Sequence, residues 1–374
     1  MKQLKAVSVI GHFGNSKLLL NGQTVKTKII TDELSKQLER DEVIKIDTAG
    51  GKSTLLKAPF QSLKALKKAK NVIIFPAHNG LRVYVPLLSF FRKFFKNRKL
   101  HYVVIGGWLP EFLKTRKSLA KKLKRFDEIY VETNTMKRAL EEQGFTNIVI
   151  MPNCKDLKIL KPEELVYPTG EPYKLCTFSR VMKEKGIEDA VNAVKEVNEE
   201  AGRTIYTLDI FGQVDSAQVQ WFEDLKTTFP DYVNYRGVVD YDKSVDVLKN
   251  YFALLFPTYY SGEGFAGTIL DAFASGVPVI ASDWKYNTEI ISSQVGFLYS
   301  THKVRCIVDI LQYIAKEPQN ITNKKLNCLN EAYNYEIQKV VGILSEKIGI
   351  ENGCFNLQNQ EMAENVDREE HPTR

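Results

Sequence analysis

Short apolar runs alternate along this chain with longer amphipathic stretches, and the alternation restarts near residue 174. In the first half, the predicted strands are 7–10, 42–46, 72–75, 102–105, 128–131 and 147–150, and the predicted helices are 25–39, 61–69, 83–95, 113–123 and 135–143. In the second half, the predicted strands are 174–178, 206–211, 233–235, 253–256 and 277–282, and the predicted helices include 186–200, 218–228, 267–276 and 334–348. Alternation of this kind indicates parallel sheets covered on both faces. The sequence therefore predicts an α/β protein with two Rossmann-like, doubly wound domains facing a cleft.

The break between the two repeats begins at Met151-Pro152-Asn153, and residues 155–173 hold three prolines without a clear period. A chain of 374 residues suits two domains. We predict an N-terminal domain over 1–160, a C-terminal domain over 161–335, a closing helix over 336–350 and a disordered tail over 351–374. The tail is polar and carries six acidic residues. Ligands of such sheets bind outside the carboxyl ends of the strands.

The cysteines and the hydropathy favour a cytoplasmic location. Five cysteines are scattered along the chain without a Cys-x-x-Cys pair, which suits free thiols in a reducing compartment better than disulfides or a zinc site. No apolar run approaches the roughly 18 residues of a membrane span. The opening residues MKQLKAVSVIGHFG predict a first strand rather than a signal peptide.

Charge is distributed unevenly between the two halves of the chain. Residues 1–150 carry 29 Lys and Arg against 12 Asp and Glu, whereas the remainder carries 23 against 33. The segments 87–100 (LLSFFRKFFKNRKL) and 114–125 (KTRKSLAKKLKR) concentrate this positive charge, the first beside Phe90, Phe91, Phe94 and Phe95. That composition favours an anionic membrane surface. The alternative is a pair of sheet-covering helices whose charges are solvated. No nucleic-acid-binding motif is present, so we expect no nucleic-acid partner.

The most informative stretch runs from Ser261 to Asp271, where a glycine-rich loop leads from a strand into a helix that starts near Gly267. Unpaired N–H groups and the dipole at such a helix start favour a phosphate or diphosphate. Glu263 in the loop and Asp271 in the helix are candidates for holding vicinal hydroxyls of a sugar or a ribose. The alternative is a solvated loop acid and an ordinary helix charge.

A second group of candidates follows the strand 174–178. Arg180 lies at its carboxyl edge, and Lys183 and Lys185 precede the next helix. Arg offers a planar fork for phosphate oxygens and Lys a point charge, so these cations are predicted to converge on the same diphosphate. The alternative is an ordinary charged surface loop.

Three further patterns imitate known motifs. The glycines Gly262-x-Gly264-x-x-Gly267 match a dinucleotide fingerprint, but the first lies about six residues past the strand. The segment 50–53 (GGKS) lacks the first glycine of a P-loop. Asp240 and Asp242 imitate a metal-binding D-x-D, but an Asp before a helix is an ordinary cap. None of the three changes the prediction of a diphosphate site, and no metal or other cofactor is expected.

The segments FSRVMKEKGIEDAV (178–191) and SGEGFAGTILDAFASGVPVIAS (261–282) resemble the retaining GT-B glycosyltransferases of family GT4. That family is marked by a Glu, seven residues and a second Glu in this loop and helix, with an Arg and a Lys upstream. Here the second acid is Asp271, shorter by one methylene, and the usual E-G-F-G appears as E-G-F-A-G. Residues 21–24 (NGQT) resemble the family's first glycine loop and 151–154 (MPNC) its Pro-Asn hinge segment.

The resemblance implies a role for each matching residue. Arg180 and Lys185 would neutralise the leaving diphosphate, and Glu263 would hold the donor sugar. The other implied donor contacts are the amides of Phe265, Ala266 and Gly267, the Asp271 carboxylate at the ribose, the loop 237–239 with Val239 at the base, and Gly22. Relatives place a His or Asp where this chain has Gly106-Gly107-Trp108, so His78 and Trp108 are only weak acceptor-side candidates.

Taken together, these features predict a hexosyltransferase that moves a sugar, with retention, from a nucleotide-diphosphate sugar to a glycan or lipid-linked acceptor. A UDP-sugar donor, surface polysaccharide biosynthesis and a peripheral position at the inner face of the membrane are expected. The N-terminal domain would bind the acceptor and the C-terminal domain the donor. Two alternatives stay open, namely a nucleotide-sugar epimerase or hydrolase of the same fold, and a basic membrane-binding module without catalysis.

Overall fold

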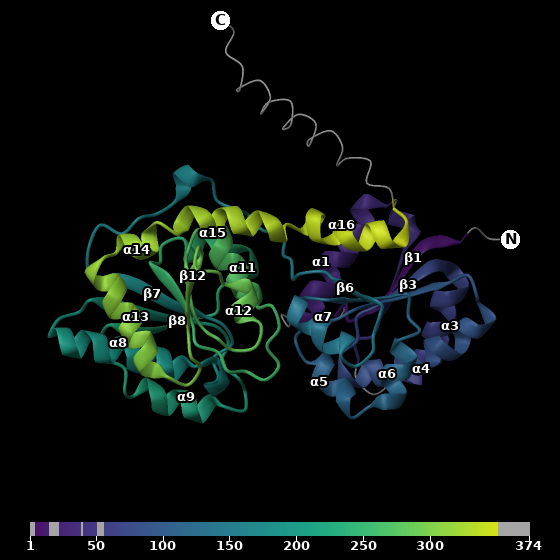
Figure 1. The fold of residues 1–374 in the computed structure, drawn as a ribbon, viewed down its shortest axis with the longest axis horizontal. Coiled ribbons are helices and arrows are strands. Elements are labelled where there is room, and N and C mark those ends of the chain that lie inside the picture. The colour runs from purple at the N-terminus through teal and green to yellow at the C-terminus, as the bar shows by residue number, and fades with distance from the viewer. Residues whose placement is uncertain (1–3, 15–21, 39, 51–55, 351–374) are drawn as a thin grey trace, which may run out of the picture. The chain divides into compact units, whose positions relative to one another are not determined.

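The computed structural model describes residues 4–14, 22–38, 40–50 and 56–350 (Figure 1). The predicted disordered tail 351–374, Asn21 of the glycine-loop motif and residues 51–53 of the P-loop-like pattern lie outside the described residues. The chain forms two compact units. The first contains residues 1–103, 125–128 and 337–374, and the second contains 104–124 and 129–336.

The first sheet has six strands in the order β2-β1-β3-β4-β5-β6. They are β1 (Lys5–Gly11), β2 (Val43–Asp47), β3 (Ala69–Ile74), β4 (Lys99–Val103), β5 (Glu128–Val131) and β6 (Ile148–Ile150). β1 pairs in parallel with β2 and β3, and its last five residues are buried. Burial of successive residues is expected where both faces of a parallel sheet are covered.

Helices cover both faces of the sheet in the first unit. Figure 1 shows α1 (Gly22–Gln37) and α16 (Ile337–Ile348) on one side of β1 and β3, and α3 (Ala58–Lys68) and α4 (His78–Phe91) on the other. The last helix therefore packs beside the first, where the Ser345 hydroxyl donates to Gln37 Oε1 at 2.5 Å. In addition, Asn71 Nδ2 donates to the Ile348 carbonyl at 3.3 Å.

The helix predicted over 113–123 is interrupted. Two short helices, α5 (Leu109–Lys114) and α6 (Lys117–Leu123), replace it, and α7 (Asn134–Glu141) follows. The break lies at Arg116, whose backbone angles (φ −123°, ψ 56°) are not helical. Its guanidinium stacks 3.9 Å from the centre of the Phe112 ring, and Nη1 donates to the Phe112 carbonyl at 2.9 Å. The spacing of hydrophobic residues along the sequence does not reveal this break in the helix.

The second sheet has six strands in the order β12-β11-β10-β7-β8-β9. They are β7 (Tyr173–Phe178), β8 (Tyr206–Phe211), β9 (Val233–Gly237), β10 (Ala253–Phe256), β11 (Val279–Ser282) and β12 (Gly296–Tyr299). The pairings are parallel. Read from β9, this is the strand order of a Rossmann fold, and its topological switch point lies between β7 and β10. The prediction of two Rossmann-like, doubly wound sheets is confirmed.

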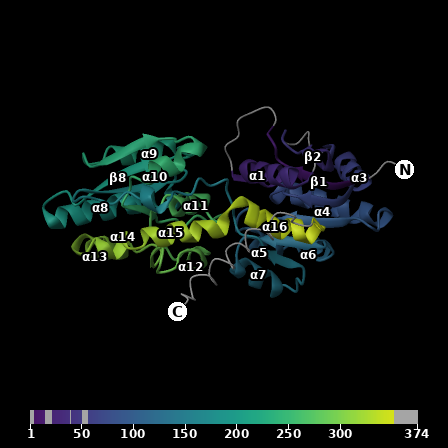
Figure 2. The ribbon, with the colours of Figure 1, turned by 90° about the horizontal axis from the view of Figure 1, so that it is seen from above.

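The helices of the second unit are mostly short. Besides α5, α6 and α7, they are α8 (Ile187–Ala201), α9 (Val219–Lys226), α10 (Ser244–Leu248), α11 (Gly267–Ala274), α12 (Asn287–Ile290), α13 (Val304–Lys316), α14 (Gln319–Thr322) and α15 (Lys325–Ala332). In Figure 2, α13, α14 and α15 follow one another along one edge of the unit. β12 and α13 are not among the predicted elements, although Ile307, Leu311 and Ile314 of α13 have helical spacing and are buried.

Within the described residues, none of the helices combines the length and the apolar character needed to cross a bilayer. In the same part of the chain, no three His, Cys, Asp or Glu side chains gather closely enough to hold a metal ion. Cys154, Cys176, Cys306 and Cys328 are free thiols.

Candidate functional site

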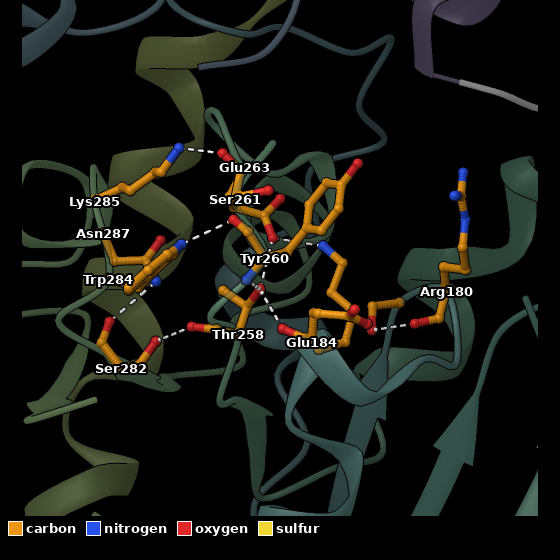
Figure 3. Close-up of polar contacts among 12 residues, drawn as sticks. Arg180, Glu184, Thr258, Tyr260, Ser261, Glu263, Ser282, Trp284, Lys285 and Asn287 are labelled. Carbon is orange, nitrogen blue, oxygen red and sulfur yellow. Dashed lines mark hydrogen bonds and ion pairs between the residues drawn. The ribbon is translucent and has the colours of Figure 1, made fainter. Parts of the chain in front are cut away.

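The loop that follows β10 is fixed by the segment that follows the neighbouring strand β11. The Ser282 hydroxyl donates to the Thr258 carbonyl at 2.5 Å, and Trp284 Nε1 donates to the Tyr260 carbonyl at 2.8 Å (Figure 3). Asn287 Nδ2 in turn donates to the Ser282 carbonyl at 3.0 Å. These bonds hold the loop at the carboxyl edge of the sheet, next to the switch point where ligands of such folds bind.

Glu263 is buried in this loop and has two polar partners. Its side chain is 9% exposed, and Oε2 accepts from Lys185 Nζ at 2.5 Å and from the Thr258 hydroxyl at 2.8 Å. Charge-assisted bonds of this kind hold a carboxylate in one orientation. Two of the predicted site residues, Glu263 and Lys185, are therefore brought into contact.

Gly186 lets Lys185 reach this position. The 3-10 turn Lys183–Lys185 ends at Gly186, which adopts the left-handed conformation at φ 69°. A Cβ atom there would overlap with the carbonyl group of Pro257, at the end of β10. Only glycine combines this φ with so close a backbone approach.

The start of α11 offers N–H groups toward the same loop. Within the described residues, the N–H groups of Ala266, Gly267 and Thr268 have no hydrogen-bond acceptor. The Thr268 hydroxyl is also buried there without a partner. The Phe265 N–H, by contrast, donates to Glu132 Oε2 at 3.0 Å. Two of the three predicted amides are thus open to a ligand, at the positive end of the helix.

Asp271 lies in the next turn of α11 and forms an ion pair that the sequence analysis does not predict. Lys155 Nζ lies 2.6 Å from each of its carboxylate oxygens. Burial raises the pKa of Asp271, and Lys155 opposes that shift. A cavity of about 300 Å³ opens beside the pair, and Tyr241 and Ser244 are among the residues that line it. Its position beside α11 suits the nucleoside part of a ligand.

The remaining donor-side candidates are Arg180, Val239 and Gly22. Arg180 follows β7, and its side chain, 54% exposed, stands apart from Glu263 and Thr258 (Figure 3). Its nearest charge is Asp215, with 3.5 Å between Nη1 and Oδ2. Val239 is half-buried in the loop after β9. Gly22 is the first residue of α1 in the first unit, with open space around its Cβ position.

The two weak acceptor-side candidates have ordinary surroundings. His78 is exposed at the start of α4 in the first unit. Trp108 lies in the second unit, and its indole N–H donates a hydrogen bond to the Ile105 carbonyl at 2.8 Å. Beside it, a Cβ atom on Gly107 would overlap with the Glu263 carbonyl and the Tyr286 ring, which explains why a glycine stands there.

Four polar residues of the site were not singled out from the sequence, namely Lys155, Thr258, Thr268 and Lys285. Lys285 has φ 50°, rare for a non-glycine residue, and its ammonium donates to the Ser261 carbonyl (Figure 3). Burial lowers the pKa of Lys285, and Glu263 opposes that shift. Thr258 and Lys285 follow strands and Thr268 opens a helix, and that position is the signal available in the sequence, whereas Lys155 lies in the linker without such a signal.

Comparison with known proteins finds a family model that is similar to this part of the chain. Residues 172–317 match the family model described as glycosyl transferases group 1. The GtfA subunit of a UDP-N-acetylglucosamine–peptide N-acetylglucosaminyltransferase from Streptococcus pneumoniae is 26% identical over 229 residues, which cover 60% of this chain and 44% of GtfA. GtfA from Streptococcus agalactiae is 29% identical over 239 residues, which cover 62% and 45%. The chain thus spans less than half the length of these relatives.

Solved structures extend the likeness to nearly the whole chain. Anabaena HepE in complex with UDP-glucose has a TM-score of 0.68 at 13% identity, covering 91% of this chain and 98% of HepE. Sucrose-phosphate synthase from Thermosynechococcus elongatus has a TM-score of 0.70 at 16% identity, covering 96% and 99%. At such identities the likeness establishes the fold. The chain has the GT-B fold of these glycosyltransferases, and the residues similar to the group 1 glycosyl transferase model lie in its C-terminal half.

Proposed function

We propose that this chain transfers a sugar from a nucleotide-diphosphate sugar, with a UDP-sugar as the favoured donor, to a glycan or lipid-linked acceptor. The observation that carries the proposal is the Glu263–Lys185 pair beside the open N-terminus of α11. This places a hydroxyl acceptor and a cation next to backbone N–H groups that suit a diphosphate. The nucleotides in related structures support UDP, since pneumococcal GtfA was solved with UDP and GlcNAc, and HepE with UDP-glucose.

The proposed reaction depends mainly on fixed positive charge that stabilises the leaving diphosphate. Cleavage of a glycosyl–phosphate bond leaves positive charge on the sugar and negative charge on the departing diphosphate. Donors aimed at that diphosphate lower the barrier because they need no reorganisation as the charge develops. The N–H groups of Ala266 and Gly267 and the Lys185 ammonium supply such donors. Arg180 would join them by turning its exposed side chain away from Asp215.

Glu263 would hold the hydroxyls of the donor sugar. Oε2 is already bound to Lys185 and Thr258, so Oε1 is the oxygen proposed to accept from the sugar. Retention of the anomeric configuration and a role in surface polysaccharide assembly are inferred from the GT4 resemblance. No metal or other cofactor is required by this scheme.

Product analysis distinguishes transfer from the two related activities. The purified chain is incubated with UDP-glucose or UDP-N-acetylglucosamine, with and without a panel of glycan and polyprenyl-phosphate-sugar acceptors. Transfer predicts UDP release that depends on acceptor, with a new glycoside whose anomeric proton shows the donor's configuration by NMR. Acceptor-independent release of free sugar would instead establish a hydrolase, and a changed sugar in the nucleotide pool an epimerase.

We further propose that the first unit binds an anionic membrane, which would make the protein peripheral at the inner face. α3 and the end of α4 carry exposed apolar side chains, and the two helices pack side by side (Figure 1). Phe60 is 77% exposed, Phe90 54% and Phe94 70%. Around them, Lys57, Lys64, Lys67, Lys93 and Lys96 are exposed. Aromatic rings flanked by lysines suit the interface of an anionic bilayer.

Vesicle sedimentation tests this second proposal. Wild-type protein should bind vesicles that contain phosphatidylserine, bind phosphatidylcholine vesicles weakly, and lose binding as salt rises. The triple variant with Phe60→Ser, Phe90→Ser and Phe94→Ser should lose binding. Tyr313→Ser is the control, because Tyr313 is a comparably exposed aromatic (51%) on α13 in the other unit. Equal binding by wild type and triple variant would exclude this membrane surface.

A further inference from the structure

Lys155 lies where the nucleotide is proposed to bind. It follows β6, and its side chain passes the first turn of α11, with Cδ 3.5 Å from the position of a Cβ on Gly267. Its ammonium then reaches both carboxylate oxygens of Asp271 at 2.6 Å each. The side chains are 13% and 6% exposed, respectively. The lysine therefore runs from the helix N-terminus, where the diphosphate is proposed to bind, to the acid proposed for the ribose.

The cavity beside the pair faces the lysine as well as the acid. It measures about 300 Å³, and Lys155, Tyr241, Ser244 and Asp271 all line it. The ammonium lies 4.5 Å from the centre of the Tyr241 ring. The carboxylate of Asp271 is engaged by Lys155, and the Ser244 hydroxyl donates to the Tyr241 carbonyl at 3.2 Å. A ligand in this cavity would meet Asp271 together with Lys155.

A ribose diol needs both kinds of partner, because each hydroxyl donates one hydrogen bond and accepts others. A carboxylate only accepts and an ammonium only donates. Asp271 is one methylene shorter than the glutamate of the family pattern, and it is almost fully buried. Because the Asp271 side chain is shorter, its carboxylate leaves room for the ammonium group of Lys155 at the edge of the cavity.

We propose that Lys155 and Asp271 together bind the ribose of the donor, with Lys155 donating to a ribose hydroxyl and Asp271 accepting from one. This inference rests on the proposed function, and it adds a nucleotide-contacting residue that the glycosyltransferase resemblance does not supply. The rival explanation is that Lys155 only neutralises a buried carboxylate. Removing it would then weaken folding, and it would affect all nucleotides alike.

Discrimination between ribose and deoxyribose separates the two explanations. Dissociation constants are measured by calorimetry for UDP and 2′-deoxy-UDP on full-length wild type, Lys155→Met and Lys155→Arg. Wild type should prefer UDP by at least about tenfold, because a site built around a hydroxyl rejects the analogue that lacks it. Lys155→Met should bring the two constants within about twofold of each other. Lys161→Met, an exposed lysine of the same linker, is the matched control and should keep the preference.

Thermal unfolding of each variant is measured alongside. Lys155→Arg keeps the positive charge beside Asp271, so this variant should fold normally. Its larger head group should still reduce the preference for UDP over 2′-deoxy-UDP. If Lys155→Met does not fold, the Lys155→Arg variant distinguishes the two explanations. Equal discrimination by wild type and both variants would overturn the ribose role, as would a wild type without any preference. A wild type that binds none of UDP, GDP or ADP would overturn the proposed function itself and this inference with it.

Discussion

Lys185 and Glu263, 78 positions apart in the chain, meet at 2.5 Å with 12% and 9% of their side chains exposed. The lysine comes from the turn after β7 and the glutamate from the loop after β10. These two strands are neighbours in the sheet although they are far apart in the chain. The pair therefore exists because the strand order reverses at this point, and it places a cation and a carboxylate at the switch point of the sheet.

Replacement of Glu263 by alanine should reduce turnover at least about 100-fold, which corresponds to ~2.7 kcal/mol in the barrier. The loss is expected because the donor sugar would lose its hydroxyl acceptor and Lys185 its partner. Steady-state kinetics with a UDP-sugar donor measure the effect. Asp231→Ala, between α9 and β9, changes an exposed acid and serves as the control. Near-normal turnover in Glu263→Ala would remove this residue from the site.

Gly186→Ala should weaken donor binding and lower stability more than the same change at another left-handed glycine. Both Gly186 (φ 69°) and Gly202 (φ 62°) carry a backbone cost of about 1 kcal/mol for a side chain. Only at Gly186 would the new Cβ also overlap with the Pro257 carbonyl, whereas the space around Gly202 is open. Urea unfolding and nucleotide titration of both variants check this. Similar losses for the two would show that the approach to Pro257 is unimportant.

The fold was largely predictable because its signal is regular. Strands inside the sheets, such as β1 and β10, have largely apolar, buried sequences, and such sequences are what covered parallel sheets require. Two features were not predictable in this way. β12 has the same length as β10, but only its two end residues are buried, and the break between α5 and α6 depends on the stacking of Arg116 on Phe112. A hydrophobic period carries no information on either feature.

The candidate site was predictable only where it follows a linear pattern. Glu263, Gly267 and Asp271 lie within one stretch of sequence, so their spacing alone predicts that they belong to one site. Lys155 lies 116 positions from Asp271 and meets it only in the fold. Nothing in the residues around Lys155 distinguishes it from the other lysines of the linker, which is why the ion pair needed the structure.

His101 should make the first unit less stable as the pH falls. Its side chain is fully buried beside Asn71, and burial lowers its pKa to about 4, with Asp127 opposing the shift. Between its ordinary pKa of 6.5 and 4, the unfolded chain takes up a proton that the folded chain does not. Stability is therefore present above that window and is lost as the pH falls through it, by up to about 3 kcal/mol.

Urea unfolding of wild type and His101→Gln across this window checks the prediction. The carboxylates titrate in both proteins, so only the difference between the two curves reports on His101. The wild type should lose more stability than the variant as the solution is acidified. Parallel curves would mean that His101 is already protonated in the folded state.

Lys325 should give the second unit a pH dependence of the same direction, but in an alkaline window. Its side chain is fully buried, its ammonium donates to the Gly276 carbonyl at 3.1 Å beyond the end of α11, and burial lowers its pKa to about 8, with Cys328 opposing. From pH 8 to its ordinary value of 10.5, the unfolded chain holds a proton that the folded chain has released. Unfolding free energy should therefore rise with pH across this window.

Thermal unfolding of Lys325→Met against wild type tests this prediction. Methionine has a similar length and no charge, so the variant should lack the rise with pH that the wild type shows. Lys324→Met is the neighbouring control, because Lys324 is far less buried and its ammonium bonds to the Ser293 carbonyl at the surface. An equal rise in wild type and Lys325→Met would mean that another group is responsible and that Lys325 stays charged inside the fold.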